Sequence, residues 1–387
     1  MNGPSEMKQQ QETGQTGMPA INTLYFYLTE GCNLACRHCW MGPRFDATGS
    51  HYPTLPVEVF ETAIREAKPL GLTGVKLTGG EPLLHPEFTR FLEIVRREEL
   101  KLTLETNGLL CTPEIAAEIA KSPDRFVSVS IDGTDAATHE WVRGVPGSFK
   151  AAQQAVRNLV ATGTRPQVIF TVMRGNAAQV DAIVRMAEEL GAHSIKFNVV
   201  QPTARGEKLH ADQETLNIAD LIALGRHVEK DLAPKTRLKL FFHYPHAFTA
   251  LNRIASGDGC SACGIFGILG VIASGHYALC GIGEQVPELV FGEVGKDLLE
   301  EVWRENAILI ALRDGLPERL EGVCGRCLMK RACLGQCVAQ NYYRKGSLWA
   351  PNWFCEQAED AGLFPASRLV TRSTQSPPLT IGNAVAE

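Results

Sequence analysis

Three cysteines, Cys32, Cys36 and Cys39, stand at C-x3-C-x2-C spacing directly after a strand-like run. A loop that leaves a strand can place such thiols around one face of an iron–sulfur cube, whose irons are normally bound by cysteine thiolates. Three protein ligands leave one iron open to bind and activate a small molecule. The same spacing also fits a zinc site, with His38 as a further ligand, or three ordinary buried thiols. The motif alone leaves these alternatives open.

A second motif, Gly79-Gly80-Glu81-Pro82, follows about 40 residues later at the end of another strand-like run. Its glycines permit close backbone approach and positive φ, which exposes carbonyl groups to an ammonium donor. Together the two motifs resemble the radical S-adenosylmethionine (SAM) superfamily, whose signature is C-x3-C-x-aromatic-C followed by a GGEP-type turn. The resemblance implies a catalytic [4Fe–4S] cluster bound by Cys32, Cys36 and Cys39, with SAM on its open iron.

The resemblance also implies which residues surround SAM. The glycine-rich turn would bind the methionyl amino group, and Ser130 and Arg143 stand where many relatives contact the carboxylate. A guanidinium suits bidentate pairing with that group. Val200, with Val199 before it, would flank the adenine, and His38 replaces the aromatic residue that the family usually has beside it. The expected SAM-binding residues are therefore His38, Gly79, Gly80, Glu81, Pro82, Ser130, Arg143 and Val200.

Eight further cysteines lie towards the C-terminus: Cys260 and Cys263, then a G-x4-C element that ends at Cys280, and a dense group of five from Cys324 to Cys355. They resemble the SPASM domain, which carries two auxiliary [4Fe–4S] clusters in radical SAM enzymes. The resemblance implies one cluster on Cys260, Cys263, Cys280 and Cys337, and another on Cys324, Cys327, Cys333 and Cys355. The pattern itself requires only one of Cys260 and Cys263. Two zinc ribbons would use the same cysteines four at a time.

The twelfth cysteine, Cys111, stands apart from these groups. It precedes a helix-like stretch, and we expect it to be a buried structural thiol.

Strand-like and helix-like stretches alternate from residue 22 onward and would position these motifs. The expected strands are 24–29, 74–78, 101–105, 126–131, 167–172 and 194–200, and the expected helices lie near 57–68, 86–98, 113–121, 148–162, 176–190 and 213–231. Six such units predict an α/β fold with a parallel sheet and right-handed crossovers, a partial (β/α)6 TIM-like barrel followed by a small cysteine-rich SPASM domain. The motif loops follow strand ends, where barrel active sites lie.

The same pattern predicts the domain boundaries. We expect residues 1–20 to be a disordered leader, 21–235 the barrel, and 236–259 a linker with a further strand-like run at 238–242. Residues 260–360 would form the SPASM domain, with a helix at 297–313, and residues 361–387 a disordered tail.

Composition excludes some classes of function. The chain has 387 residues, of which 44% are hydrophobic and 21% charged, as in an ordinary globular protein. A net charge of −5 gives no reason to expect nucleic acid or an anionic membrane as a partner. Because no apolar run reaches about 18 residues and no secretory signal is evident, we expect a cytoplasmic protein.

The resemblance implies reductive cleavage of SAM to a 5′-deoxyadenosyl radical, which abstracts hydrogen from a substrate C–H bond. A ferredoxin or flavodoxin would supply electrons, and the auxiliary clusters could accept one from the substrate. The leading hypothesis is modification of a ribosomally synthesised peptide by cross-linking, epimerisation or backbone excision. Because only 31 residues precede Cys32, we expect any leader recognition to need a separate protein.

Other functions fit the sequence as well. One is small-molecule radical chemistry in tetrapyrrole or quinone cofactor biosynthesis, and another is a non-catalytic zinc-binding scaffold. Sulfatase maturation is disfavoured, because Gly281 stands where that subfamily has an aspartate base.

Overall fold

The computed structural model describes residues 19–48, 50–256 and 263–370. Their centre is a ten-stranded sheet in the order β12-β11-β10-β1-β4-β5-β6-β7-β8-β9. Seven parallel strands supply most of it: β1 Thr23–Tyr27, β4 Gly74–Thr78, β5 Lys101–Thr106, β6 Arg125–Ser130, β7 Gln167–Val172, β8 Ser194–Val199 and β9 Lys239–Phe242. The first six match the expected strands, and the parallel sheet of the predicted partial barrel is confirmed.

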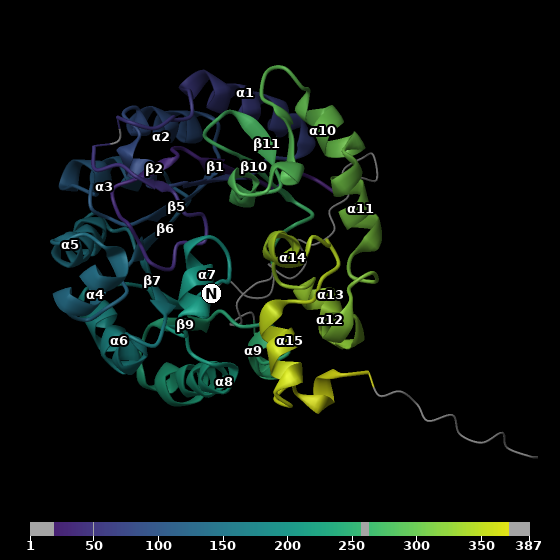
Figure 1. Cartoon of the computed structure of the whole chain (residues 1–387). Helices are drawn as coiled ribbons and strands as arrows, with labels where there is room; N and C mark the ends of the chain where they lie inside the picture. The colour runs from purple at the N-terminus through teal and green to yellow at the C-terminus, as the bar shows by residue number, and fades with distance from the viewer. Residues whose placement is uncertain (1–18, 49, 257–262, 371–387) are drawn as a thin grey trace, which may run out of the picture.

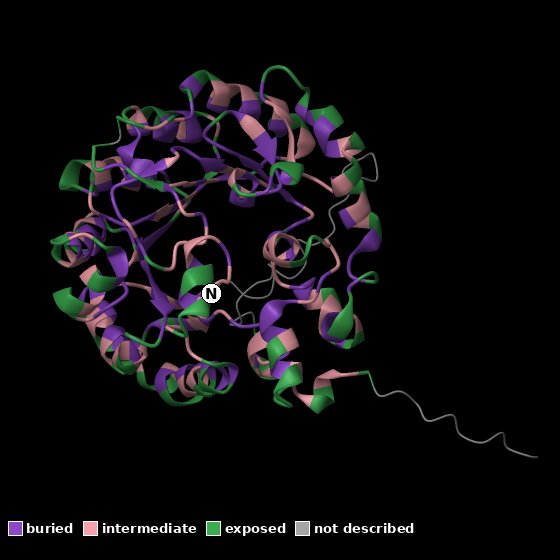
Figure 2. Ribbon diagram, in the orientation of Figure 1, coloured by how far each residue is buried: buried purple, intermediate pink, exposed green. Residues whose placement is uncertain are grey.

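Helices cover the outer face of this curved sheet, as Figure 1 shows. They are α1 Val57–Ala67, α2 Phe88–Arg97, α3 Pro113–Ala120, α5 Ser148–Ala161, α6 Val180–Glu189 and α8 Ile218–His227. In α1 the buried residues recur at helical spacing, so that one stripe faces the sheet. Phe26 of β1 packs on Phe60 of α1 with ring centroids 4.3 Å apart, and Phe60 in turn meets Phe91 of α2 at 4.7 Å. The core therefore lies between sheet and helices, where Figure 2 is mostly purple.

The inner face of the sheet is more polar than the outer one. Tyr25 of β1 alternates with the fully buried Leu24 and Phe26, so its side chain lies on the opposite face. In register, Tyr25 is beside Lys76 of β4. Parallel sheets normally bury both faces in apolar residues, so polar groups on an inner face mark a cavity or a site.

The boundary expected near residue 236 does not separate two sheets. Residues 239–242, expected within a linker, form β9 and pair with β8. At the other edge, β10 Ile268–Val271 pairs in parallel with β1, and β11 His276–Ala278 and β12 Val290–Glu293 continue in antiparallel order. The main-chain groups at the β1 edge would otherwise lack partners, which explains why the cysteine-rich region joins the sheet.

The C-terminal helices complete the ring opposite the barrel helices (Figure 1). They are α9 Leu251–Ala255, α10 Leu299–Glu305, α11 Ala307–Gly315, α12 Gly322–Arg326, α13 Lys330–Cys333, α14 Val338–Lys345 and α15 Trp353–Asp360. The single helix expected at 297–313 is instead α10 and α11, because Asn306 is extended and caps α11 through Ile308 and Leu309 N–H groups.

Two further differences concern short elements and the tail. The sequence prediction missed α4 Ala136–Arg143 and α7 Arg205–Ala211, both of which prove important at the site. Residues 361–370, expected to be disordered, pack onto the fold, and Leu369 forms a β-bridge with Cys327. The expected leader at residues 1–18 and the tail beyond residue 370 lie outside the described residues. In the described part of the chain, no helix is long and apolar enough to cross a membrane.

Candidate active site

The cysteine loop follows β1 and is partly held by a short pairing of β2 Gly31–Cys32 with β3 Arg44–Phe45. Cys32 and Cys36 are buried, and Cys39 is half-buried; all three belong to one small cluster of side chains. Burial raises the pKa of Cys32 well above its usual range, and the nearby Cys36 thiol raises it further. Thiols must lose their protons to bind a metal, so metal binding would oppose this shift. The structure thus brings the three predicted ligands together.

Helix α4 holds the first half of this loop. Ala35 and Arg37 donate their N–H groups to the carbonyl oxygens of Arg143 and Val142, both at 3.0 Å. The helix ends at Gly144 with φ +76°, where a Cβ would lie 3.0 Å from the Ala35 oxygen. The C-terminal carbonyl groups of α4 therefore bind the cysteine loop where a helix normally leaves them unsatisfied.

Helix α7 holds the second half through Arg205, which the sequence analysis missed. Its N–H donates to the Cys39 oxygen at 3.2 Å, and its Nη1 donates to the Cys36 oxygen at 3.3 Å. Nothing in the local sequence marks Arg205, because its role depends on α7 folding back over the cysteine loop.

A buried ion pair lies beneath the cysteines. Arg143 Nη2 is 2.7 Å from Asp132 Oδ2, and Arg143 Nη1 is 3.5 Å from Cys36 Sγ. His38 Nε2 is 2.8 Å from the same Asp132 oxygen. Burial would raise the pKa of Asp132, but the charge of Arg143 and then of His38 holds it well below its ordinary value. Arg143 is therefore a fixed cation beside a cluster thiol, and Asp132 is the anion that orients it.

These contacts bear on two predicted SAM-binding residues. The His38 ring is directed to Asp132, and Arg143 is bonded to Asp132 and Cys36. The Arg143 Nε atom is buried and has no hydrogen-bond partner among the residues the structure describes. This nitrogen remains available to a ligand, so the expected carboxylate contact stays a prediction.

The turn 79–82 lies directly against the cysteine loop. Gly79 has φ +127°, and a Cβ on Gly80 would be 1.9 Å from the Gly31 oxygen. Gly80 donates its N–H to Thr29, and Glu81 donates its N–H to Gly31, at 2.9 and 3.1 Å. No side chain fits at Gly80, because the two motif loops are joined by their main chains.

The carboxylate of Glu81 is fully occupied within the protein. It accepts hydrogen bonds from Thr106 Oγ1 at 2.6 Å, from the Asn107 N–H at 2.8 Å and from the Leu83 N–H at 3.1 Å. Burial raises its pKa to about 7, against the opposing effect of these donors. The side chain of Glu81 therefore joins the turns after β4 and β5.

Through this link Asn107 reaches the cysteines, a role that the sequence analysis did not assign. Its Nδ2 donates to Asn33 Oδ1 at 2.7 Å and lies 3.9 Å from Cys32 Sγ.

The remaining predicted residues are placed less tightly. Pro82 is buried at the start of a 3-10 turn, Pro82–Leu84. Ser130 is half-buried at the end of β6. Val200 is buried in a small cluster with Val142, Met173 and Leu209, and Val199 is buried at the end of β8. All stand at the carboxyl ends of their strands or directly after them, where ligands bind in such folds.

The predicted second auxiliary set converges on one cavity. Cys324, Cys327, Cys333 and Cys355 all line it. The N–H groups of Asn352 and Met329 point to Cys324 Sγ and Cys327 Sγ at 3.4 and 3.3 Å. Such N–H···S contacts accompany thiolates bound to iron–sulfur clusters.

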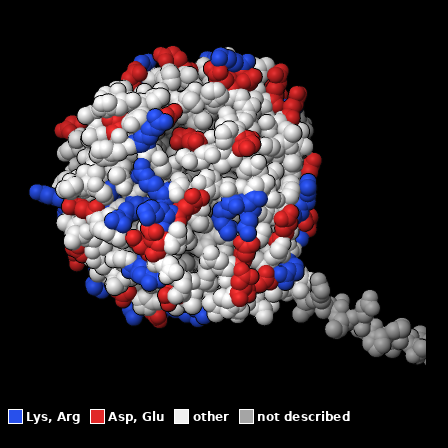
Figure 3. All heavy atoms as spheres, viewed as in Figure 1, with Lys and Arg blue, Asp and Glu red and all other residues white. Residues whose placement is uncertain are grey.

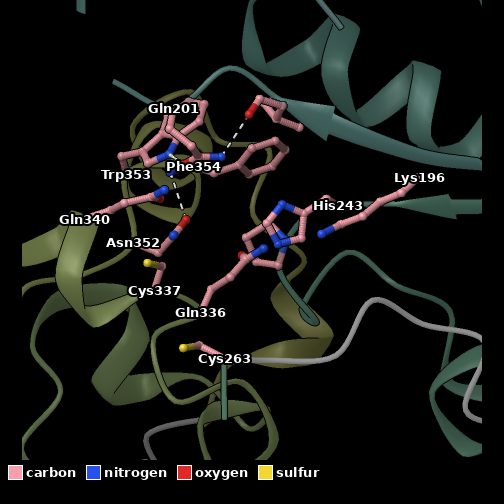
Figure 4. Close-up of a pocket in the computed structure, with 12 residues that line it drawn as sticks. Lys196, Gln201, His243, Cys263, Gln336, Cys337, Gln340, Asn352, Trp353 and Phe354 are labelled. Atoms are coloured by element: carbon pink, nitrogen blue, oxygen red, sulfur yellow. Dashed lines mark hydrogen bonds between the residues drawn. The ribbon is translucent and has the colours of Figure 1, made fainter. Parts of the chain in front are cut away.

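The predicted first auxiliary set is only partly visible, because Cys260 lies outside the described residues. Burial raises the pKa of Cys263 well above its usual range, and the nearby Cys337 and Cys280 thiols raise it further. Cys263 and Cys337 line a cavity of about 190 Å³ between the barrel and α14–α15, which Figure 4 shows in close-up. Among the described residues, no three His, Cys, Asp or Glu side chains are placed to hold a single metal ion. Cys111 is buried in the core, apart from these sets.

Residues 26–188 match the family profile described as the radical SAM superfamily. This range contains the cysteine loop, the turn 79–82 and the Asp132–Arg143 pair. This part of the chain belongs to the radical SAM superfamily. The protein is accordingly a radical SAM enzyme, and SAM and a [4Fe–4S] cluster are its implied cofactors.

Relatives of this radical SAM enzyme span most of its length. It is 29% identical over 344 residues to an AdoMet-dependent heme synthase of Methanosarcina barkeri, covering 85% of this chain and 94% of that protein. It is 26% identical over 370 residues to the mycofactocin maturase MftC of Mycobacterium tuberculosis, covering 93% and 89%. The fold is similar to that of Streptococcus suis SuiB bound to the precursor peptide SuiA, with a TM-score of 0.69, 17% identity and coverage of 88% and 76%.

The cysteine loop of this radical SAM enzyme fits the cluster that the family implies. The three cysteines lie in one small cluster of side chains, Arg143 supplies a positive charge to one of them, and the Leu34 N–H donates to Cys32. Amide donors and a cation stabilise an anionic iron–sulfur cluster.

Proposed function

We propose that this radical SAM enzyme modifies a ribosomally synthesised peptide, by cross-linking, epimerisation or backbone excision. The observation that carries the proposal is a cavity of about 190 Å³ at the carboxyl ends of β8 and β9, lined by amide side chains and by thiols of the first auxiliary set. One relative is named a mycofactocin maturase, and the solved structure of SuiB contains its precursor peptide SuiA.

Each predicted site residue has a role in this proposal. Cys32, Cys36 and Cys39 bind the cluster, and the turn 79–82 with Ser130, Val200 and Arg143 surrounds SAM. When bound, cluster and SAM supply a 5′-deoxyadenosyl radical that removes hydrogen from a C–H bond of the substrate. The protein holds the ligands in place: Asp132 orients Arg143, Arg205 and α4 fix the loop, and the buried setting excludes water.

The C-terminal cysteines are proposed to hold two auxiliary [4Fe–4S] clusters, with Cys260 as the fourth ligand of the first. Four thiols in one cavity fit a fully ligated cube, which has no open iron for substrate and is suited to electron transfer. A ferredoxin or flavodoxin would supply the electron for SAM cleavage, and a separate protein would recognise any leader.

The cavity composition favours a peptide. Gln201, Gln336, Gln340 and Asn352 line it together with Trp353. Carboxamide groups both donate and accept, as a peptide backbone requires, and Trp supplies an apolar face. On the face seen in Figure 3, Lys and Arg side chains lie over α7 and α14 with acidic side chains among them, so that neither sign of charge dominates.

The test is co-expression with each short peptide encoded beside the gene, followed by mass spectrometry. The expected result is a mass change in one peptide that requires SAM-dependent activity. A variant with Cys32, Cys36 and Cys39 changed to alanine is the control and should leave the peptide unmodified. Unchanged masses for every neighbouring peptide, with 5′-deoxyadenosine still formed on another added substrate, would overturn the peptide proposal.

A tetrapyrrole is the second candidate substrate, because the heme synthase relative is 29% identical over 85% of this chain. Anaerobic incubation of the reconstituted enzyme with SAM, dithionite and tetrapyrroles that carry carboxylate side chains separates the two. Peptide modification predicts no change in the tetrapyrrole mass. Loss of carbon dioxide from the tetrapyrrole would favour the second candidate.

A further inference from the structure

The inner face of the barrel carries a small group of charges that the proposed chemistry does not use. Lys76 Nζ of β4 is 2.8 Å from Glu105 Oε1 of β5, and it lies 5.0 Å from the centre of the Tyr25 ring. Burial would raise the pKa of Glu105, but the charges of Lys76 and then Lys196 hold it below its ordinary value. Lys196 thus faces the same interior from β8, without being part of the pair.

Lys196 forms no hydrogen bond or ion pair with any residue that the structure describes, whereas Lys76 is paired. Lys76, Lys196 and Glu105 together carry one net positive charge. Lys196 is half-buried, and a cation without a partner at the wall of a cavity can bind a ligand of opposite charge. This cavity is the 190 Å³ space described above, and Lys196 is the cation among its described lining residues.

The neighbours of Lys196 do not neutralise it. In Figure 4 its amino group extends towards His243, which follows β9. Burial lowers the pKa of His243 to about 3, and the charge of Lys196 acts in the same direction, so the imidazole is neutral. His243 can therefore bond a ligand but adds no charge of its own.

Two acceptors without partners among the described residues lie at the cavity or on the same strand as Lys196. Gln336 Oε1 lines the cavity wall, and Asn198 Oδ1 lies two residues from Lys196 on β8; both oxygens are buried and lack a partner in the described part of the chain. Buried carbonyl oxygens without partners are costly and call for N–H donors. A cation beside free acceptors matches a ligand that carries a carboxylate and peptide N–H groups.

Lys196 is not the cation that balances the negative charge of the first auxiliary thiolates. The cation that lowers the pKa of the Cys263 and Cys280 thiols is Lys76, which also pairs with Glu105. Lys196 lies across the cavity from Cys263 and Cys337 in Figure 4. The position is suited to a substrate group held between the barrel and the cysteine ligands.

We propose that Lys196 binds a carboxylate of the peptide substrate within the barrel, either an acidic side chain or the C-terminal carboxylate. This inference rests on the proposed function and narrows it to peptides that present an anion at the reacting segment. Gln336 and Asn198 accept hydrogen bonds from the same segment. An ammonium–carboxylate contact away from bulk water gives both affinity and orientation.

The experiment uses anaerobically reconstituted enzyme with SAM and three synthetic N-acetylated pentapeptides, measured by calorimetry. The first has a central Glu and an amidated C-terminus, the second has Gln instead, and the third has Gln with a free C-terminal carboxylate. We expect one carboxylate peptide to bind about tenfold more tightly than the neutral one, and the better one identifies the source of the anion.

Lys196→Gln should abolish this preference, and Lys196→Arg should retain most of it. Lys208→Gln, which removes an exposed lysine paired with Asp212, is the matched control and should leave the preference unchanged. Iron content shows that each variant is assembled. A preference that persists in Lys196→Gln, equal binding of all three peptides, or no binding of any would overturn the inference. A shift in the reduction potential of a cluster in Lys196→Gln, with the preference for carboxylate peptides intact, would also overturn the inference.

The two proposals fail separately. Absence of a modified peptide on co-expression, with 5′-deoxyadenosine still formed on another added substrate, contradicts the peptide function, whatever the calorimetry shows. A modified peptide together with no carboxylate preference contradicts only the role of Lys196.

Discussion

Single side chains decide the electrostatics around the cysteine loop. The Asp132 carboxylate pairs with Arg143 and His38 and accepts a hydrogen bond from the Thr171 N–H. Arg143 in turn contacts the Cys36 sulfur. The pair is buried, so each charge depends on the other far more than in a surface ion pair.

Changing Asp132 to Asn should therefore be costly, because Arg143 would stay buried without a counter-charge. We expect a loss of about 3–5 kcal/mol in the free energy of unfolding. Urea unfolding of the anaerobically reconstituted protein measures it. Asp212→Asn, which breaks an exposed pair with Lys208, is the comparison and should cost less than about 1 kcal/mol. Equal losses in the two variants would contradict the buried-pair argument.

The free energy of unfolding should depend on pH through Glu81 with a sign opposite to that of a usual acidic group. Burial raises its pKa from 4.5 to about 7, so the folded protein binds this proton more tightly than the unfolded chain. The contribution of Glu81 to the free energy of unfolding is fully present below pH about 4.5 and is lost as the pH rises to about 7. The change over that window is about 3 kcal/mol, at about 1.4 kcal/mol per pKa unit.

Glu81→Gln should remove this part of the pH profile, as measured by unfolding between pH 5 and 8. Glu288→Gln changes an exposed side chain and should keep the wild-type profile. An unchanged slope in Glu81→Gln would show that the carboxyl group is not protonated in the folded protein.

At the scale of elements, main-chain contacts hold the site. The β1 and β4 turns approach so closely that Gly80 meets the Gly31 carbonyl group, while the ends of α4 and the start of α7 bind the cysteine loop. Loops positioned by rigid elements in this way can keep a metal cluster in place.

Gly80→Ala should accordingly separate the two motif turns, since its Cβ would lie 1.9 Å from a main-chain oxygen. We expect SAM affinity to fall at least about tenfold, because the turn no longer sits beside the cluster. Binding of SAM to the reconstituted protein measures this. Gly346→Ala tests positive φ alone, since no atom lies within 4 Å of the added Cβ, and should retain SAM affinity. Normal SAM binding by Gly80→Ala would contradict the close approach.

At the scale of the whole molecule, the cysteine-rich region continues the barrel sheet. β10 pairs with β1, and the cavity of the first auxiliary set lies between β8–β9 and α14–α15. The radical site and the auxiliary cysteines are therefore parts of one structure.

Iron content tests this organisation. We expect about twelve irons per chain from three four-iron clusters, and about eight after Cys32, Cys36 and Cys39 are changed to alanine. Anaerobic iron and sulfide analysis measures both. A content of about eight irons in the wild type would contradict one of the two proposed auxiliary clusters. Zinc in place of iron in the C-terminal sites would contradict both auxiliary clusters.

Much of the fold could be predicted from sequence, because strand and helix periodicities are local. The parallel strands, the barrel helices and the positions of the motif loops followed from apolar spacing, and the cysteine motif with the turn 79–82 indicated the superfamily. The grouping of Cys324, Cys327, Cys333 and Cys355 rested on resemblance, and one cavity brings the four together.

Contacts between residues far apart in the chain were decided only by the tertiary structure. Asp132, Arg205 and Asn107 contact the cysteine loop or its ligands. Lys196 has no partner among the described residues and lines a cavity bordered by α15. None of these residues has a local signal in the sequence. The extension of the sheet by β9 to β12 depends likewise on edges that only the folded chain exposes. Local sequence encodes periodicity and chemically reactive residue types; which charges face one another depends on packing over more than a hundred residues.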